Sequence, residues 1–304
     1  MKSTLLSLNL FIWLLLGSRT VSAAETLLVL YPDVPAPYAE VFEQIIDGIR
    51  QQHPESLVLQ KIRESDDQDR LLRNLNASAP DMVIALGKRG YEISLALPTS
   101  LPLVIGALPL SPNGLPGISL LADPGVLFQS LRRLAPSIKR VAVVYTPGNE
   151  WLMDLAEQQT EKQGLTLIRA QVADLKEAVS RYESLLPQLD SAEDALWLPL
   201  DPVTANEQVI LPRLLQYSWD NDLVLFSSKP VHAKRGALFS TFPNHQELGR
   251  SLTLMVQGLL HKKADPEVRP LKELKLAVNL RTAAHLGFEY NTQQQKNFSL
   301  TFPD

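Results

Sequence analysis

Short apolar runs alternate with amphipathic stretches along most of this chain, and this alternation limits the fold more than any other feature. A first series comprises the strand-like runs 27–31, 56–62, 81–87 and 101–108 and the helix-like stretches 38–49, 67–75 and 91–97. In residues 38–49 the apolar side chains recur with the 3.6-residue period of a helix. Strands joined by helices run parallel, so this series predicts a parallel α/β sheet.

A second series repeats the plan, with strand-like runs 140–145, 165–172, 194–200 and 222–228 and helix-like stretches 150–162, 175–189 and 207–219. We expect two Rossmann-like lobes with parallel sheets, the alternative being one large open sheet. Residues 108–125 are rich in proline and glycine and read as a linker, or else as one long surface loop. A late helix and the strand-like run 274–280 indicate that the chain crosses back. The predicted lobes are residues 24–118 plus about 242–266, and residues 119–241 plus about 267–304.

The first residues resemble an export signal. Lys2 precedes an apolar core, "LLSLNLFIWLLLG", and the small residues of "VSA" end at Ala23. We therefore expect a signal peptide over residues 1–23. No later segment reaches the roughly 18 apolar residues of a membrane span, so the mature protein is not expected to be membrane-embedded. The chain has no cysteine, which excludes disulfides and a lipid-carrying cysteine and favours a free periplasmic protein.

Composition and motifs narrow the function. The net charge of −4 gives no sign of the basic surface that nucleic-acid binding requires. The sequence contains no nucleophile elbow, phosphate loop, dinucleotide turn or paired-histidine zinc motif. Its five histidines are scattered. We therefore expect no catalytic residue, no cofactor and no metal site, and hence no enzyme.

Polar residues directly after the strand-like runs are the candidate ligand-binding residues, because ligands of open parallel sheets lie beyond the carboxyl ends of the strands. They are Tyr31, Asp33, Tyr38, Lys88, Arg89, Tyr145, Thr146, Asn149, Asp201, Ser227, Ser228 and Lys229. Because they come from both series, a cleft between two lobes would collect them.

Several of these residues also have an interpretation that involves no ligand. Asp201 either caps the next helix or, if Thr204 and Glu207 form a capping box, is left to accept from a ligand amine. Lys88 and Arg89 conflict with the positive end of a helix, so they either hold an anionic ligand or are solvated surface cations. For Lys229 the alternative is that it extends over the cleft edge into water. For Tyr31 and Tyr145 the alternative is that they lie next to the core.

The ordered segments "RVAVVYTPGNEW", "ALWLPLDP", "RGALFSTFPNHQELGRSLTLMVQGLLHKKADPEVRP" and "KLAVNLRTAAHLGFEY" resemble the ABC transporter substrate-binding family, whose studied members include tryptophan- and tyrosine-binding proteins. The resemblance covers nearly the whole mature chain, although "ALGKRGYE" and "SPNGLPGIS" depart from the family pattern in the first lobe. It implies the type I periplasmic binding protein fold, with three crossings and an interlobe cleft that closes by hinge motion.

The implied function is that of a periplasmic solute-binding protein. It would capture a small polar ligand, such as an amino acid or a related carboxylate, for an ABC-type uptake system, with a membrane permease as its partner. The alternative is a sensory accessory protein that presents its closed state to a membrane receptor, either a kinase or a cyclase.

Overall fold

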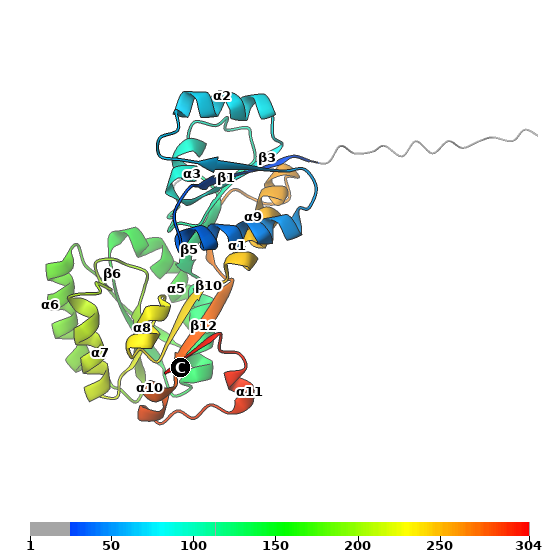
Figure 1. Cartoon of the computed structure of the whole chain (residues 1–304). Coiled ribbons are helices and arrows are strands. Elements are labelled where there is room, and N and C mark those ends of the chain that lie inside the picture. Colours follow the sequence, from blue (N-terminus) through cyan, green and yellow to red (C-terminus); the bar gives the residue numbers. More distant parts are fainter. Residues whose placement is uncertain (1–24, 113, 304) are drawn as a thin grey trace, which may run out of the picture.

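The computed structural model describes residues 25–112 and 114–303 and shows two lobes, each built around a mostly parallel sheet (Figure 1). The α/β class predicted from the alternating pattern is thus confirmed. The predicted signal peptide, residues 1–23, lies outside the described residues. Within the part of the chain that is described, no helix has both the length and the hydropathy needed to cross a membrane.

The first lobe contains a six-stranded sheet in the order β11-β5-β4-β3-β1-β2, in which every pairing is parallel. Its strands are β1 (Leu27–Pro32), β2 (Leu57–Ile62), β3 (Met82–Leu86), β4 (Leu103–Gly106), β5 (Gly117–Ala122) and β11 (Val268–Leu271). Its helices are α1 (Tyr38–Gln52), α2 (Gln68–Ser78), α3 (Gly87–Ser94) and α9 (His245–Leu260).

The second lobe contains a seven-stranded sheet in the order β13-β12-β10-β9-β8-β6-β7, in which only the β10–β12 pairing is antiparallel among the described strands. Its strands are β6 (Arg140–Tyr145), β7 (Thr166–Gln171), β8 (Asp194–Leu198), β9 (Val224–Ser227), β10 (Phe239–Pro243), β12 (Leu274–Asn279) and β13 (Leu300–Phe302). Its helices are α4 (Pro124–Leu134), α5 (Glu150–Lys162), α6 (Leu175–Leu185), α7 (Ile210–Asp220), α8 (Pro230–Arg235), α10 (Leu280–His285) and α11 (Thr292–Gln295), with short 3-10 turns at Pro147–Asn149 and Leu186–Gln188.

Both faces of each sheet are buried, which explains the uninterrupted apolar strands. In β1, Leu27 and Val29 pack in one core cluster with α1 and α9, whereas Leu28 and Leu30 pack in another on the opposite face. The second lobe follows the same rule along β6. Successive side chains of a strand point to opposite faces, so a strand covered on both sides reads as a continuous apolar run.

The chain passes between the lobes three times. It leaves the first sheet after β5, returns between β10 and α9, and leaves again between β11 and β12. The passages lie a few residues later than the predicted boundaries, since residue 118 falls inside β5 and β11 pairs with β5 in the first sheet. The interpretation of residues 108–125 as a linker without regular structure is therefore wrong for residues 117–122.

Helix α9 belongs to the first lobe because it packs against α1 at two glycines. A Cβ added at Gly48 would lie 1.9 Å from the Gln246 backbone oxygen, and one added at Gly249 would lie 2.0 Å from the Ile45 oxygen. No side chain fits at that separation, so the two helices approach at their backbones. This contact fixes α9 to a lobe that the chain left about 120 residues earlier, after β5.

Candidate functional site

Apart from β12 and β13, the strands of both sheets end on the side of the molecule where the chain crosses between the lobes. β5 ends at Ala122 immediately before one crossing, and β10 ends at Pro243 immediately before another. The parallel neighbours of β5 and β10 end at the same edges of their sheets, which we call the carboxyl edges. Ser111, after β4, donates a hydrogen bond of 3.0 Å to the backbone oxygen of Gly148, after β6. The two carboxyl edges therefore meet at this point.

Asp201 joins two loops of the second lobe at its carboxyl edge. Its side chain is buried, and Oδ2 accepts from the Thr146 backbone N–H at 2.9 Å, the Thr146 hydroxyl at 2.7 Å and the Asn149 amide at 3.0 Å. Oδ1 accepts from the backbone N–H groups of Val203 at 2.9 Å and Thr204 at 3.1 Å. The structure thus brings three of the predicted site residues together, but as partners of one another.

These bonds set the charge of Asp201. Burial acts to raise the pKa of its carboxyl, but hydrogen bonds from Thr146, Thr204 and Val203 outweigh burial and hold that pKa below its ordinary value. Asp201 is consequently a carboxylate at neutral pH, with its negative charge distributed over five donors.

The capping box expected from Thr204 and Glu207 does not form. The Thr204 hydroxyl has no hydrogen-bond partner among the described residues, and α7 begins only at Ile210. Asp201 itself accepts from the N–H groups that a cap would satisfy. The premise that left this carboxylate free for a ligand is therefore wrong, because the Glu207 side chain binds elsewhere.

Glu207 is the centre of a charged cluster after β8 and β9. It accepts from Lys229 Nζ at 3.1 Å and from Arg235 at 3.2 Å, and its Oε1 lies 3.1 Å from His232 Nε2. Burial acts to raise the pKa of Glu207, but hydrogen bonds from Lys229 and His232 lower it below the ordinary value. Lys229, a predicted ligand residue, is thus engaged by a carboxylate of its own lobe.

His232 links this cluster to Ser227. The Ser227 hydroxyl lies 2.6 Å from His232 Nδ1, and burial holds the pKa of His232 below its usual value, so the ring is neutral at pH 7. Since ionised Glu207 can only accept, Nε2 carries the proton and Nδ1 accepts from Ser227.

This hydroxyl, imidazole and carboxylate have the residue types of a nucleophilic triad. However, the Ser227 and His232 side chains are fully buried, so a substrate carbonyl cannot reach the hydroxyl. The chain of hydrogen bonds instead fixes the end of β9 to α8. Within the described residues, no group of three or more histidine or acidic side chains is placed to hold a metal ion.

Lys88 and Arg89 differ sharply in their surroundings at the carboxyl edge of the first lobe. Both belong to the first turn of α3, and both pair with Glu92, Lys88 at 4.0 Å and Arg89 at 3.2 Å. The Lys88 side chain is 87% exposed, whereas that of Arg89 is 25% exposed. The Nε of Arg89 is buried and has no hydrogen-bond partner among the described residues. A buried guanidinium nitrogen without an acceptor carries a desolvation cost, which a hydrogen-bond acceptor would relieve.

The remaining candidates of the first lobe lie around the ends of β1 and β2. Asp33 pairs with Lys61 at 3.3 Å and with Arg63 at 3.4 Å. Lys61 also lies over the ring of Tyr31, which lines a cavity of about 260 Å³ between these strands and α1. Tyr38 begins α1 and is mostly exposed. None of these contacts reaches the second lobe.

Tyr145 and Ser228 are the remaining candidates of the second lobe. The Tyr145 ring is buried, its hydroxyl accepts from Arg169 Nε at 3.2 Å, and burial raises its pKa. Arg169, on β7, is itself held by Glu150 and neighbouring carboxylates. Tyr145 therefore joins β6 to β7. Ser228 is half-buried directly after β9.

Glu207 and His232 were missed by the sequence reasoning. Glu207 was assigned to a capping box, and His232 was treated as one of several scattered histidines. A usable signal was present, because His232 and Arg235 follow Lys229 at the spacing of a helix turn and together form a basic face that requires an acidic partner. The sequence does not indicate that the partner comes from another loop.

Residues 40–297 match the model of a family described as ABC transporter substrate binding protein. A ligand-free, open structure of a substrate-binding protein with adhesive properties from Clostridium difficile covers 90% of this chain and 98% of its own, at 16% identity and a TM-score of 0.63. An ABC domain in complex with L-Trp from Streptococcus pneumonia covers 91% and 100%, at 18% identity and a TM-score of 0.54. These similarities establish the type I periplasmic binding fold. No curated protein matches the chain.

Proposed function

Because the chain belongs to the ABC transporter substrate-binding protein family, we propose that it captures a small polar ligand between its two lobes and presents the closed form to a membrane permease. The observation that carries this proposal is the meeting of the two carboxyl edges at the crossings, where Ser111 contacts Gly148. Ligands of open parallel sheets bind beyond such edges, and a ligand that contacts both lobes stabilises their approach.

Arg89 supports an anionic group on the ligand. At the carboxyl edge of the first lobe its side chain is 25% exposed, while its Nε is buried and has no hydrogen-bond partner among the described residues. Carboxylates are the acceptors that a guanidinium binds best, through charge-assisted hydrogen bonds. We therefore assign the ligand to the amino acids or related carboxylates, with Arg89 as the donor to its carboxylate.

The second lobe supplies a fixed surface opposite this arginine. Thr146 and Asn149 are held by Asp201, and Lys229 is held by Glu207. Side chains that are already fixed lose little entropy when a ligand binds. In this proposal they orient the remainder of the ligand, and its charge is met by Arg89.

Native mass spectrometry of the freshly purified protein, followed by titration calorimetry with the recovered ligand, tests the proposal. Arg89→Ala should weaken binding at least about tenfold, equivalent to 1.4 kcal/mol. The matched control is Lys88→Ala. It removes the same charge at the neighbouring position, where the lysine side chain is 87% exposed. We expect its affinity to stay within about twofold, because exposed charges contribute little. Equal effects of the two variants would contradict the assignment of Arg89.

Lobe closure and export are further parts of the proposal. Small-angle scattering should give a smaller radius of gyration at saturating ligand, because hinge closure compacts a two-lobed molecule. Mass spectrometry of the mature protein from the periplasmic fraction should place its first residue near Ala24, as expected for cleavage after "VSA". Recovery of the uncleaved chain in the cytoplasm would contradict periplasmic export.

A further inference from the structure

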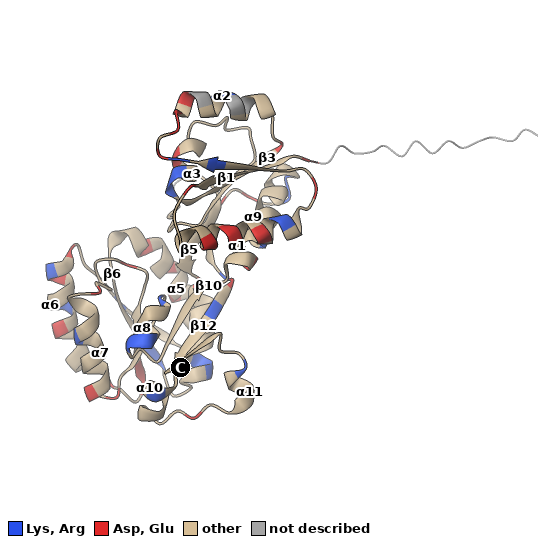
Figure 2. Cartoon of the chain, in the orientation of Figure 1, with Lys and Arg blue, Asp and Glu red and all other residues tan. Residues whose placement is uncertain are grey.

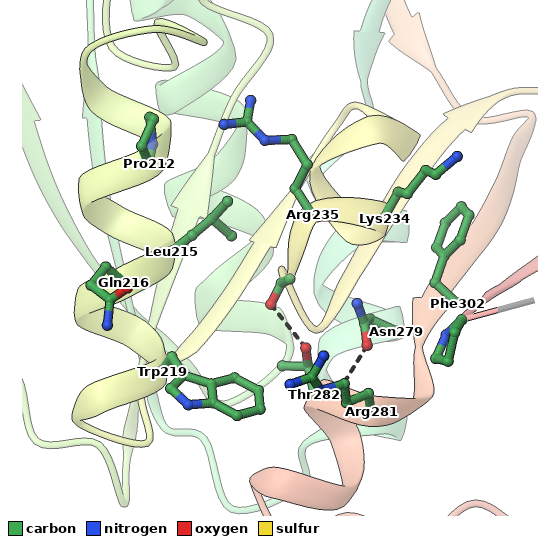
Figure 3. A pocket seen from close by; sticks show the side chains of 12 residues that line it. Pro212, Leu215, Gln216, Trp219, Lys234, Arg235, Asn279, Arg281, Thr282 and Phe302 are labelled. Atoms are coloured by element: carbon green, nitrogen blue, oxygen red, sulfur yellow. Dashed lines mark hydrogen bonds between the residues drawn. The ribbon is translucent and has the colours of Figure 1, made fainter.

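A cavity of about 610 Å³ opens on the second lobe, on the edge opposite the crossings. It is lined by residues of α7, α8, the start of α10 and the chain just before its C-terminal residue (Figure 3). Gly236 precedes β10 and Asn279 ends the antiparallel β12, so both mark the edge at which β10 begins. The carboxyl edge of the second lobe lies at the other end of β10. This cavity is therefore separate from the ligand site proposed above.

The floor of the cavity is fixed by hydrogen bonds between α8 and α10. The Asn279 amide donates to the Ala233 oxygen at 2.8 Å, and the Thr282 hydroxyl donates to the Gly236 oxygen at 3.0 Å. The Thr282 backbone N–H donates to Asn279 Oδ1 at 2.9 Å, as Figure 3 shows. Gly236 has a φ of 130°, a conformation that L side chains rarely adopt, which lets the chain turn sharply at this floor. The walls are consequently held in place without a ligand.

Trp219 presents an immobilised aromatic surface at one end of the cavity. It is 37% exposed, and its indole stacks on the His285 ring at a centroid distance of 3.8 Å and an interplanar angle of 4°. His285 is held in turn by the Trp219 backbone oxygen at 2.9 Å and by Asp222 at 3.1 Å. The guanidinium carbon of Arg281 lies 5.3 Å from the indole centroid. An exposed tryptophan held in this way requires little further ordering to receive a flat ring.

The charge of the cavity lining is positive. Lys234, Arg235 and Arg281 line it, and the described lining residues include no acidic side chain. In Figure 2 the ribbon of α8 carries the blue colour of lysine and arginine. Arg235 is paired with Glu207 at 3.2 Å, but among the described residues neither Lys234 nor Arg281 forms an ion pair with a carboxylate. Two cations of the lining are therefore available to an anion.

We propose that this cavity is a second binding site, for small aromatic carboxylates. The ring of the ligand lies against Trp219, and its carboxylate meets Arg281, whose guanidinium lies beside the indole (Figure 3). Phe302 lines the other side of the cavity, and Lys234 above it adds to the positive charge of the lining. Arginine beside an indole favours a ligand that is both flat and anionic, because the guanidinium offers a planar face and parallel N–H donors together. A cavity of about 610 Å³ has the size of ordinary small-molecule sites.

The test uses the mature protein labelled with 5-fluorotryptophan and titrated with 2-naphthoate, followed by fluorine NMR. The Trp219 signal is assigned with Trp219→Phe. We expect a saturable shift of that signal by 2-naphthoate, and binding of the neutral analogue 2-naphthamide at least about tenfold weaker. Absence of a saturable shift, or equal binding of acid and amide, would overturn the proposal.

Matched variants separate this site from the interlobe site. The double variant Lys234→Ala, Arg281→Ala should weaken 2-naphthoate binding at least about tenfold, whereas Lys162→Ala, Lys263→Ala removes two exposed cations elsewhere and should leave it unchanged. Arg89→Ala should also leave the Trp219 response unchanged. If Arg89→Ala abolishes the response, or the double variant retains full affinity, the second site does not exist. Circular dichroism checks that every variant is folded.

Discussion

Replacing Asp201 by asparagine should strongly destabilise the protein. The side chain is 1% exposed, and its two oxygens accept five hydrogen bonds, from Thr146 (two), Asn149, Val203 and Thr204. An asparagine amide has one acceptor oxygen, so in either orientation at least two of these donors would face an NH₂ group. Hydrogen bonds to charged groups contribute about 1.5–3 kcal/mol each. We therefore expect Asp201→Asn to lower the free energy of unfolding by about 3–6 kcal/mol.

Urea unfolding followed by circular dichroism measures this loss, and Asp174→Asn is the matched control. Asp174 is an exposed N-cap of α6 that accepts from the Glu177 N–H at 2.9 Å, and asparagine caps helices about as well as aspartate. The control should change the free energy of unfolding by less than about 0.5 kcal/mol. A loss below about 1 kcal/mol for Asp201→Asn, or equal losses for both variants, would refute the view that Asp201 organises the two loops.

Three further changes test the packing and charge of the described residues. Gly249→Ala should lower the free energy of unfolding by about 1–3 kcal/mol, because its Cβ would lie 2.0 Å from a backbone oxygen of α1. The control Gly148→Ala, with open space around its Cβ, should change the free energy of unfolding little. Similar urea midpoints for the two variants would contradict the close helix contact. Arg140→Ala should lower the free energy of unfolding in the same assay by more than the loss of an exposed ion pair does, because it leaves the buried Asp194 without the two bonds of 2.6 Å that it now accepts. A loss typical of surface pairs would contradict this. Burial holds the pKa of His232 below its unfolded value of about 6.5, so the unfolded chain binds its proton first and stability should fall as the pH drops below about 6.5; His232→Gln should make that decline shallower, and an unchanged slope would contradict the assignment.

The lobes could be predicted from the sequence because their strands are short apolar runs buried on both faces, separated by helices with a clear period. The strands that were missed lack such local signals. β11 (Val268–Leu271) alternates a half-buried valine, an arginine and a proline, and it pairs with β5 about 150 positions earlier in the chain. A strand formed by long-range pairing rather than by its own pattern has no periodicity to detect. β5 (Gly117–Ala122) is a short buried apolar run, but the prolines and glycines on both sides of it favour a linker in the sequence.

The site could be predicted only as a set of positions. The rule of carboxyl ends correctly placed Thr146, Asn149 and Asp201 at one edge, since topology alone fixes where a strand stops. It could not tell whether each side chain faces a ligand or a neighbour. Asp201 is occupied in part by Thr146 and Asn149, which follow a different strand, β6. Glu207 is likewise held by residues that follow β9. Spacing within one helix contains no information about a partner on another.

In the proposed ligand site, the two lobes differ in whether their polar groups already have hydrogen-bond partners. This difference bears on how ligand binding would drive closure. In the second lobe, Asp201 and Glu207 already accept hydrogen bonds from the polar groups around them. A ligand that binds there gains contacts but does not supply a missing hydrogen-bond partner. In the first lobe, the buried Nε of Arg89 has no acceptor within the described part of the chain. A ligand shifts a conformational equilibrium only by its differential affinity for the two states. If the ligand rests first on the prepared second lobe, the bond to Arg89 forms only when the lobes approach, and its free energy is therefore available to favour the closed state. In the proposed closure, the pivot would lie at the crossings, where Ser111 already contacts Gly148.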